Sequence, residues 1–389
     1  MRPGLILLCL AYVLSQFFRA FLAVLAGVLE RDIGVSADDL AQASGLWFLS
    51  FAAMQLPVGW ALDRIGPRRT AAFLLLMGGG GGAIVFALAT QALHINLAML
   101  MIGIGCAPVL MSSYYIFART YPAARFATLA ALMLGVGSVG NLVASYPMAL
   151  ATEWIGWRWA LAGLGAMSAT VAFGIFLSVR DPEKAPGGQA GSLLSLIKLP
   201  ALWAILPVMM VSYAPAGAIR GLWIGPYLGD VFGQNTAQIG AATLIMGTAM
   251  IAGTFFFGPL DRMLGTRKWV IFPANLIGAL ATLALAYWSG MNAALAIVLM
   301  AVIGFMCGTF PVIIAHGRSF FPPHLVGRGV TLMNLFGIGG VGVLQFASAR
   351  VHDAVPGGGN APYTAIFALF GLALLVGTLA YLSSRDSVD

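Results

Sequence analysis

The chain alternates between long apolar stretches and short polar ones. The apolar stretches fall near residues 4–28, 42–62, 70–91, 95–117, 127–151, 159–179, 200–228, 237–259, 269–289, 293–315, 329–350 and 363–383. Most are about as long as the roughly 20 residues that a helix needs to cross the hydrocarbon core of a bilayer. The pattern therefore predicts an all-α membrane protein with twelve transmembrane helices.

The composition excludes a soluble protein. Of the 389 residues, 60% are hydrophobic and only 8% are charged, whereas about 25% are charged in an average soluble domain. A soluble fold has too much surface to remove so many apolar side chains from water. The cysteines Cys9, Cys106 and Cys307 all lie in apolar stretches without ligand spacing, so we expect no disulfide framework, no metal and no cofactor.

The net charge of +7 reports membrane topology. If the N-terminus is inside, the cytoplasmic segments contain most of the basic residues: Arg2, Arg64, Arg68, Arg69, Arg119, Arg125, Arg180, Lys184, Lys198, Arg262, Arg267, Lys268, Arg318, Arg328 and Arg385. The opposite side has only Arg31, Arg158 and Arg350. This asymmetry follows the positive-inside rule. It predicts a multi-pass protein of the cytoplasmic (inner) membrane with both termini in the cytoplasm, and it removes the reason to expect a nucleic-acid partner.

The sequence also repeats itself with a period near 200 residues. The stretch 59–69 returns in reduced form at 258–268, with Asp63 and Asp261 198 positions apart. Arg119 and Arg318 are offset by 199, and the glycine-rich stretch 134–140 returns at 336–342. These landmarks predict two six-helix pseudo-repeats: an N-terminal bundle at 1–179, a cytoplasmic linker at 180–199 and a C-terminal bundle at 200–389.

The stretch at 59–69 reads Gly-x-x-x-Asp-Arg-x-Gly-x-Arg-Arg between two predicted spans, and here the chain resembles the major facilitator superfamily over essentially its whole length. The preceding residues 55–59 are similar to the organic-anion branches of that family. The resemblance implies the major facilitator fold and secondary transport by alternating access. We expect the motif to form a conformational latch, because a carboxylate among arginines can make charge-assisted bonds in one state and release them in another. The predicted latch residues are Gly59, Asp63, Arg64, Gly66, Arg68, Arg69, Asp261 and Arg262. The alternative is that the arginines only anchor the loop inside.

Two charged residues lie well within predicted spans, Arg19 and Arg220, which are 201 positions apart. A charge at this depth is costly and points to function. The resemblance implies that their two helices line a central cavity, and the family's glycerol-phosphate and phosphate antiporters carry an arginine on each. Every Asp and Glu lies in a loop or at a helix end, so we expect the substrate to supply the negative charge. The alternative is that each arginine bonds to carbonyl groups or extends to the interface.

Helical spacing places aromatic and amide side chains on the same faces as these arginines, which suits a small organic anion, by preference a carboxylate. Tyr12 and Gln16 accompany Arg19, and Tyr213, Trp223 and Tyr227 accompany Arg220. Trp47, Tyr115, Asn141 and Asn334 complete the predicted binding residues. As alternatives, tyrosine and tryptophan near helix ends belong to interfacial belts, Tyr227 above all, and the polar residues join helices.

The coupling mechanism stays open, because no predicted span contains a carboxylate and His316 lies at a helix end, where we expect a loop or capping role. Either a co-transported proton or an exchanged anion fits. The rival functions are an exporter of amphipathic compounds or drugs and a non-transporting receptor or sensor of the same fold. Enzyme activity is not expected, because no Ser/His/Asp set, metal cluster or nucleotide-binding loop occurs. We expect a monomer in the lipid bilayer with a small anionic substrate.

Overall fold

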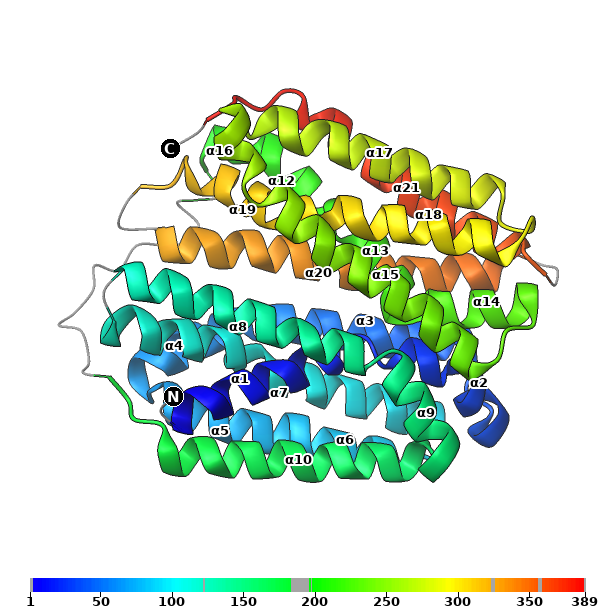
Figure 1. Ribbon diagram of the computed structural model, residues 1–389, viewed down its shortest axis with the longest axis horizontal. Coiled ribbons are helices and arrows are strands. Elements are labelled where there is room, and N and C mark those ends of the chain that lie inside the picture. The colour runs from blue at the N-terminus through cyan, green and yellow to red at the C-terminus, as the bar shows by residue number, and fades with distance from the viewer. Residues whose placement is uncertain are drawn as a thin grey trace. The chain divides into compact units, whose positions relative to one another are not determined.

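The computed structural model describes residues 3–121, 123–182, 196, 198–322, 326–355 and 359–387, and of residues 123–128, 130–131 and 326–328 it describes the backbone only. All regular elements in these ranges are helices (Figure 1). The chain divides into two compact units, Met1–Gly187 and Gly188–Asp389. The division falls inside the range 180–199, whose limits as a linker stay a prediction. Arg2, Lys184 and most of that range, together with the side chains of Arg125 and Arg328, lie outside the description.

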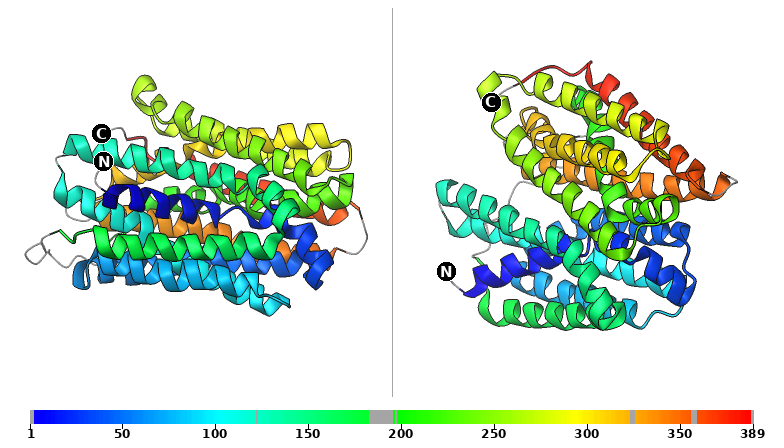
Figure 2. Two further views of the ribbon diagram at one scale, coloured as in Figure 1. Left: turned by 60° about the horizontal axis from the view of Figure 1, so that its bottom comes forward. Right: turned by 45° about the vertical axis from the view of Figure 1, so that its right-hand side comes forward.

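The first unit begins with two helix pairs that each correspond to one predicted span: α1 (Pro3–Phe17) with α2 (Leu22–Ile33), and α3 (Ala37–Ala53) with α4 (Gln55–Arg64). The third span comprises α5 (Pro67–Leu74), the π-helical η1 (Leu75–Gly81) and α6 (Gly82–Ala87). It is followed by α7 (Ala92–Thr120), by α8 (Ala123–Val143) with α9 (Tyr146–Ile155), and by α10 (Trp157–Ser178). Helix α1 lies beside α8 (Figure 1, Figure 2).

The second unit also follows the predicted order of spans, but its helices are interrupted at other places. Its first span contains α12 (Pro200–Ser212), α13 (Ala214–Ala218), the π-helical η2 (Ile219–Trp223) and α14 (Ile224–Phe232). The next two are α15 (Thr236–Phe257) with α16 (Leu260–Leu264), and α17 (Lys268–Tyr287). A 3-10 turn, η3 (Cys307–Thr309), joins α18 (Ala293–Met306) to α19 (Phe310–Arg318), and α20 (Val326–Ala354) and α21 (Ala361–Tyr381) complete the unit.

The predicted number of spans is confirmed if bent helix pairs are counted as single crossings. Within the described ranges, ten helical segments are long and apolar enough to cross a membrane, and two further pairs pass the same test together but are bent, by 54° between α1 and α2 and by 44° between α8 and α9. The predicted spans at 4–28 and 127–151 are thus each formed by two helices with a break between them. Pro147 lies at the start of α9. It has no N–H to donate to the carbonyl of Val143, the last residue of α8, and its ring would clash with that carbonyl in a continuous helix, so the helix breaks before it. At the other break the helix tightens, since the N–H of Ala20 donates to the carbonyl of Phe17 only three residues earlier.

Several helices start before their apolar stretch, because acidic and polar residues fit the first turn. Helix α3 begins at Ala37, where the Ser36 hydroxyl accepts from the N–H of Asp39 and the Asp39 carboxylate accepts from the N–H of Ser36. This capping box satisfies donors that have no partner inside the helix. Asn235 and Gln238 cap α15 in the same way. The predicted spans were bounded by apolar residues, so they could not include these polar first turns.

Glycines let the first helix of each unit approach its fifth span closely. A Cβ at Gly140 would overlap the carbonyl oxygen of Val13, and one at Gly340 would overlap that of Met210. The two glycines are 200 positions apart and belong to the repeated glycine-rich stretches. The pairs α1–α8 and α12–α20 thus pack backbone against backbone, as small residues allow between membrane helices.

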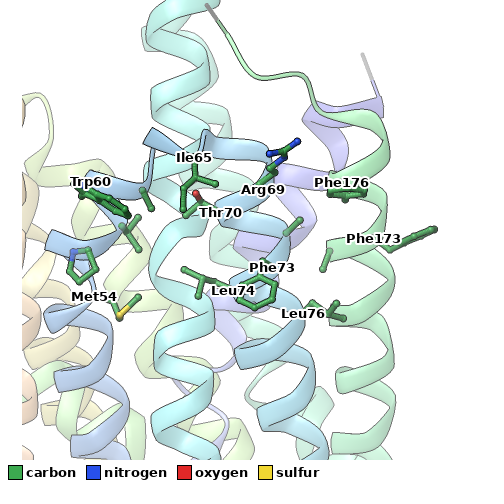
Figure 3. Close-up of a pocket in the computed structure, with 15 residues that line it drawn as sticks. Met54, Trp60, Ile65, Arg69, Thr70, Phe73, Leu74, Leu76, Phe173 and Phe176 are labelled. Carbon is green, nitrogen blue, oxygen red and sulfur yellow. The ribbon is translucent and has the colours of Figure 1, made fainter. Parts of the chain in front are cut away.

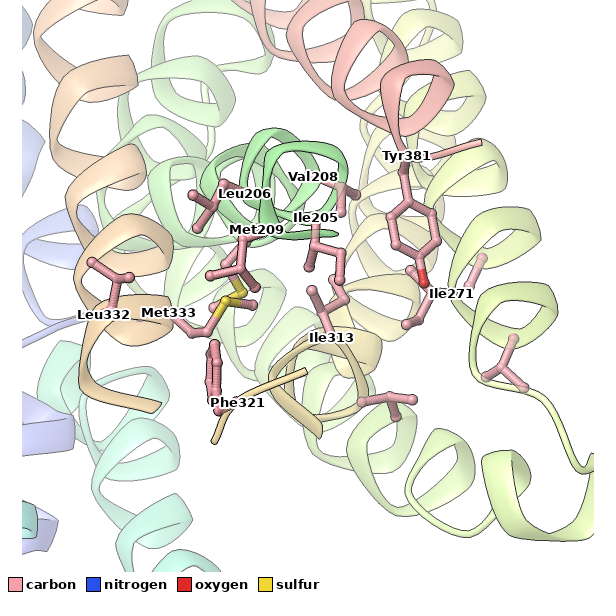
Figure 4. Packing of buried hydrophobic residues seen from close by; sticks show 14 of the residues in the cluster. Ile205, Leu206, Val208, Met209, Ile271, Ile313, Phe321, Leu332, Met333 and Tyr381 are labelled. Carbon is pink, nitrogen blue, oxygen red and sulfur yellow. The ribbon is translucent and has the colours of Figure 1, made fainter. Parts of the chain in front are cut away.

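The core of the second unit surrounds α12 (Figure 4). Fully buried side chains from five helices meet there: Ile205 and Met209 (α12), Ile271 (α17), Ile313 (α19), Met333 (α20) and Tyr381 (α21). His316 is also fully buried. Its Nε2–H donates to the carbonyl of Arg385 at 2.8 Å, which leaves Nδ1 to accept from the Tyr381 hydroxyl at 2.7 Å. His316 therefore joins α19 to the end of α21 and has a structural role.

Candidate functional site

Arg19 lies in the break between α1 and α2 and contacts aromatic side chains of α3. Its guanidinium carbon is 5.4 Å from the ring centroid of Trp47 and 5.6 Å from that of Phe51. These two rings are stacked on each other at 5.2 Å, and Trp47 is buried. A cation over aromatic faces is stabilised where water is scarce. Broken spanning helices are also where transporters place their binding sites.

Three polar atoms near this arginine are buried without a hydrogen-bond partner among the described residues: Arg19 Nε, Trp47 Nε1 and Gln16 Oε1. Leaving a buried polar group unsatisfied costs about 1–3 kcal/mol. Two of the three atoms are donors and one is an acceptor. The arrangement is therefore suited to a ligand that offers oxygen acceptors together with a hydrogen-bond donor.

Arg220 lies in the π-helical turn η2 and is 4% exposed. Its guanidinium lies against α15 at Gly247, where an added Cβ would come within 2.9 Å of Nε and 3.0 Å of Nη2. Glycine therefore leaves the space that this side chain occupies. Single π-helical turns inside spanning helices occur mostly at functional sites, so both arginines lie at irregular backbone.

A buried cysteine interacts with each arginine, and these two pairs were not predicted from the sequence. Cys106 on α7 is within electrostatic reach of Arg19, and Cys307 in η3 is within reach of Arg220. The cysteines are 201 positions apart, the same offset as the arginines. That shared offset was the available signal, and it extends the pseudo-repeat to the surroundings of the two charges.

The other predicted binding residues are distributed over both units. Tyr12 is buried in α1, where its ring fills the space above Gly137 of α8. The ring of Tyr213, between α12 and α13, lies 5.3 Å from that of Phe310 at the start of α19. The remaining placements are as follows: Asn141 is half-buried on α8, Asn334 is half-buried on α20, and Trp223 is fully buried and donates from Nε1 to the Ser348 hydroxyl at 2.8 Å.

Tyr227 and Tyr115 differ from the expected pattern. The hydroxyl of Tyr227 is fully buried and donates to the carbonyl of Ser289 at 2.6 Å, so this residue does not belong to an interfacial belt. The hydroxyl of Tyr115 donates to Asp63 at 3.2 Å, which places it with the loop motif and not beside Arg19. Conversely, Gln345 is fully buried on α20 with neither amide atom paired among the described residues, and it joins the candidate residues of the second unit.

The predicted latch motif of the first unit makes two separate contacts. Asp63 accepts the bond from Tyr115, and its carboxylate is 3.9 Å from Nη2 of Arg119 on α7. The backbone N–H of Arg68 donates to Asp181, which follows α10, at 2.8 Å. Gly66 has a φ of +102°, and a Cβ there would lie 2.9 Å from the Asp181 carboxylate. Glycine is therefore required at 66 both by its backbone conformation and by this contact.

The second copy of the motif is a buried ion pair. Asp261 and Arg267 are 3.1 Å apart, and both side chains are only 8% exposed. Arg262, the other predicted latch residue of this copy, contributes its backbone N–H to Asp261. Asp386, which follows α21, accepts from the N–H groups of Arg267 and Lys268 at the start of α17 and from the Thr266 hydroxyl. Asp386 thus occupies in this unit the place that Asp181 has in the first.

Burial raises the pKa of Asp386, but the hydrogen bonds from Thr266, Lys268 and Arg267 lower it more, so that the pKa lies below its ordinary value. Because the pKa is lower in the folded state, the stabilisation is present above the unfolded value of about 3.9 and is lost as pH falls through the folded value. We expect Asp386→Ala to cost about 1 kcal/mol at pH 7, as for other helix caps. Thermal unfolding of both proteins between pH 7 and pH 3 should show the difference shrink as the pH falls below about 4. Asp353→Ala, at an exposed position, is the control, and a difference that stays constant down to pH 3 would contradict the assignment.

Comparison with known proteins agrees with this architecture. The sequence model of the Major Facilitator Superfamily matches residues 8–233, whereas no curated protein sequence gives a significant match. The structure is similar to that of a bacterial homologue of the human lysosomal transporter Spinster in its inward-facing, unoccupied conformation, with a TM-score of 0.71 and 15% identity over 97% of this chain and 94% of that chain. It is also similar to a variant of the nucleoside transporter NupG (TM-score 0.77, 15% identity, 98% and 99% coverage). A D-xylose–proton symporter is matched equally well (TM-score 0.77, 15% identity, 98% of both chains). At this level of identity the structural matches establish the fold alone.

Proposed function

Because the chain belongs to the major facilitator superfamily, we propose that it is a secondary transporter that moves a small organic anion across the cytoplasmic membrane by alternating access. Arg19 and Arg220 bind the negative charge of the substrate. The positive-inside pattern supports a topology with both termini in the cytoplasm. The observation that carries the proposal is the surroundings of Arg19, where a half-buried guanidinium lies on α3 next to buried polar atoms that have no hydrogen-bond partner among the described residues.

The chemistry of those atoms supports a carboxylate. A guanidinium presents parallel donors that match the two oxygens of a carboxylate, and Trp47 Nε1 is a further donor nearby. No Asp or Glu occurs in the spans that contain Arg19 and Arg220, apart from those near the ends of these segments. We expect the ligand to supply the negative charge at Arg19, because no ion pair in the described part of the chain involves this residue. A bound carboxylate would then offset the cost of this half-buried cation.

Gln16 narrows the class of anion. Its Oε1 atom is a buried acceptor without a partner among the described residues, so it favours a substrate that carries a hydroxyl, amide or amine hydrogen close to the carboxylate. The aromatic surfaces of Trp47 and Phe51 favour an organic body. A substituted carboxylic acid satisfies all of these groups, whereas an inorganic anion without an O–H hydrogen leaves the Gln16 oxygen unsatisfied.

The loop motif supports a conformational role. The contact of Asp63 with Arg119 is long, and the side chain of Asp63 is 67% exposed, so this pair can separate at little cost. The matching pair of the second unit, Asp261 with Arg267, is short and buried. We therefore assign the releasable latch contact to the first copy and a permanent brace to the second.

Uptake by purified protein in proteoliposomes tests the proposal. The expected result is saturable uptake of at least one labelled substituted carboxylate, with other carboxylates competing and phosphate or sulfonate competing less. Running the panel with and without a pH gradient, and with unlabelled anion preloaded inside, separates proton coupling from anion exchange. Saturable transport of amphipathic cations, with no anion transported, would instead support the drug-exporter alternative.

A further inference from the structure

An apolar groove of about 760 Å³ runs between α4, the α5–η1 segment and α10 of the first unit (Figure 3). Its size is within the range of roughly 300–1,000 Å³ that is usual for ligand pockets. Its lining includes Trp60, Phe73 and Phe173, which are 61%, 63% and 63% exposed. The three elements belong to segments that are apolar enough to cross a membrane. The groove therefore opens toward the surroundings of the bundle, which for spanning helices is lipid.

Arg69 is the only charged residue among those that line the groove. Figure 3 shows its guanidinium at the rim, where α5 begins, above the apolar side chains. It is exposed, and none of the ion pairs found in the described part of the chain involves it. The other polar lining group, the Thr70 hydroxyl, already donates to the carbonyl of Gly66 at 2.8 Å. The charge at the rim is thus available to a ligand.

The second unit shows how the same position is used when its role is structural. Lys268 occupies the place of Arg69, offset by 199 positions. Its Nζ donates to the carbonyl oxygens of Leu382 and Ser384 at 2.6 and 2.8 Å. Arg68, the neighbour of Arg69, is also engaged, because it contacts Asp181 and the ring of Phe176. Of these cations, Arg69 is the one without such contacts.

We propose that this groove is a binding site for one anionic phospholipid, whose phosphate contacts Arg69 and whose acyl chain fills the apolar channel. An apolar hollow at membrane depth is filled by hydrocarbon, and a basic residue at the end of a span lies at head-group depth, where it attracts anionic lipid. Trp60, at the same end of the groove, is suited to the interface. The proposal requires only that these helices span a membrane and does not depend on which substrate is transported.

Native mass spectrometry of protein taken from nanodiscs with equal amounts of phosphatidylglycerol and phosphatidylcholine tests the site. We expect the unaltered chain to retain one phosphatidylglycerol. Arg69→Gln should reduce its occupancy at least five-fold, Arg69→Lys should restore part of it, and Ala61→Phe, at a lining position, should exclude the lipid. Arg262→Gln removes the same charge from an exposed position in the second unit and should leave occupancy unchanged.

Three outcomes would overturn the proposal. Equal losses in Arg69→Gln and Arg262→Gln would mean that the lipid follows overall charge. Retention of phosphatidylcholine as strongly as phosphatidylglycerol would remove the role of Arg69 in selecting the head group. A dimer that is broken by Ala61→Phe, with no lipid bound, would show that a second copy of the chain covers the groove. Size-exclusion profiles and circular dichroism identify any variant that fails to fold, in which case Arg69→Lys and Arg262→Gln still decide between the outcomes.

Discussion

Arg19→Gln and Arg220→Gln are each expected to lower kcat/KM for anion uptake about 100-fold. A charge-assisted hydrogen bond contributes about 1.5–3 kcal/mol, and a guanidinium that binds a carboxylate through two donors loses both when it is replaced by an amide. A loss of about 3 kcal/mol corresponds to a factor of roughly 150. Initial rates of labelled-carboxylate uptake in proteoliposomes measure the effect. Arginine-to-lysine variants should be intermediate, because they keep the charge but lose the planar fork.

Matched variants separate binding from folding. Arg31→Gln changes an exposed arginine on α2, close in sequence to Arg19, and should transport normally. Because Arg19 Nε has no hydrogen-bond partner among the described residues, Arg19→Gln should change the free energy of unfolding by no more than about 1 kcal/mol. A large loss of stability would assign this arginine a structural role. Unchanged uptake in both arginine-to-glutamine variants would refute the anion site.

The second large effect is expected at Asp261. Asp261→Ala leaves the buried Arg267 charge without its carboxylate, which typically costs about 3–5 kcal/mol. Asp63→Ala breaks a long, exposed contact and should cost less than about 1 kcal/mol. Thermal unfolding of the two variants in detergent compares them directly, at positions that are equivalent in the sequence repeat.

A double variant tests the cause of this difference. Replacing both members of the buried pair, as in Asp261→Leu with Arg267→Met, should recover most of the lost stability, because no unpaired charge remains. Equal effects of Asp63→Ala and Asp261→Ala would contradict the division between a releasable contact and a permanent brace. An effect of Asp63→Ala on transport without one on stability would support that division.

The sequence was sufficient to predict the helical fold and its duplication. The long apolar stretches and the repeat at 59–69 and 258–268 are local features of the sequence. They can be recognised without knowing which residues are in contact in the fold. The breaks near Arg19 and Pro147 were missed, although proline gave a signal at the second. At the first break the backbone changes from helix to tight turn around Arg19, and neither proline nor glycine occurs there to enforce the change.

The charged residues of the candidate site could be predicted from the sequence, but the side chains that surround them could not. Arg19 and Arg220 stand out because a charge in an apolar stretch is conspicuous. The space at Gly247 and the stacking of Trp47 on Phe51 depend on how neighbouring helices cross. Asp181 and Asp386 lie in polar segments after the last span of each unit, and their contacts with Arg68 and Lys268 join residues more than 100 positions apart. Such pairs follow from tertiary packing, which spacing along the chain does not encode.

The π-helical turn at Ile219–Trp223 makes the second unit sensitive to the exact number of residues in one helix. A π turn accommodates about one residue more than an α turn, so a deletion of one residue there would let a regular α-helix form. Each residue of an α-helix advances by about 100°, and the deletion would therefore turn Arg220 away from Gly247 or Tyr227 away from Ser289. In an alignment of family members, a one-residue gap within this spanning helix would therefore indicate a structural difference. Chains with the gap would lack this arginine pocket, and chains without it would share the pocket.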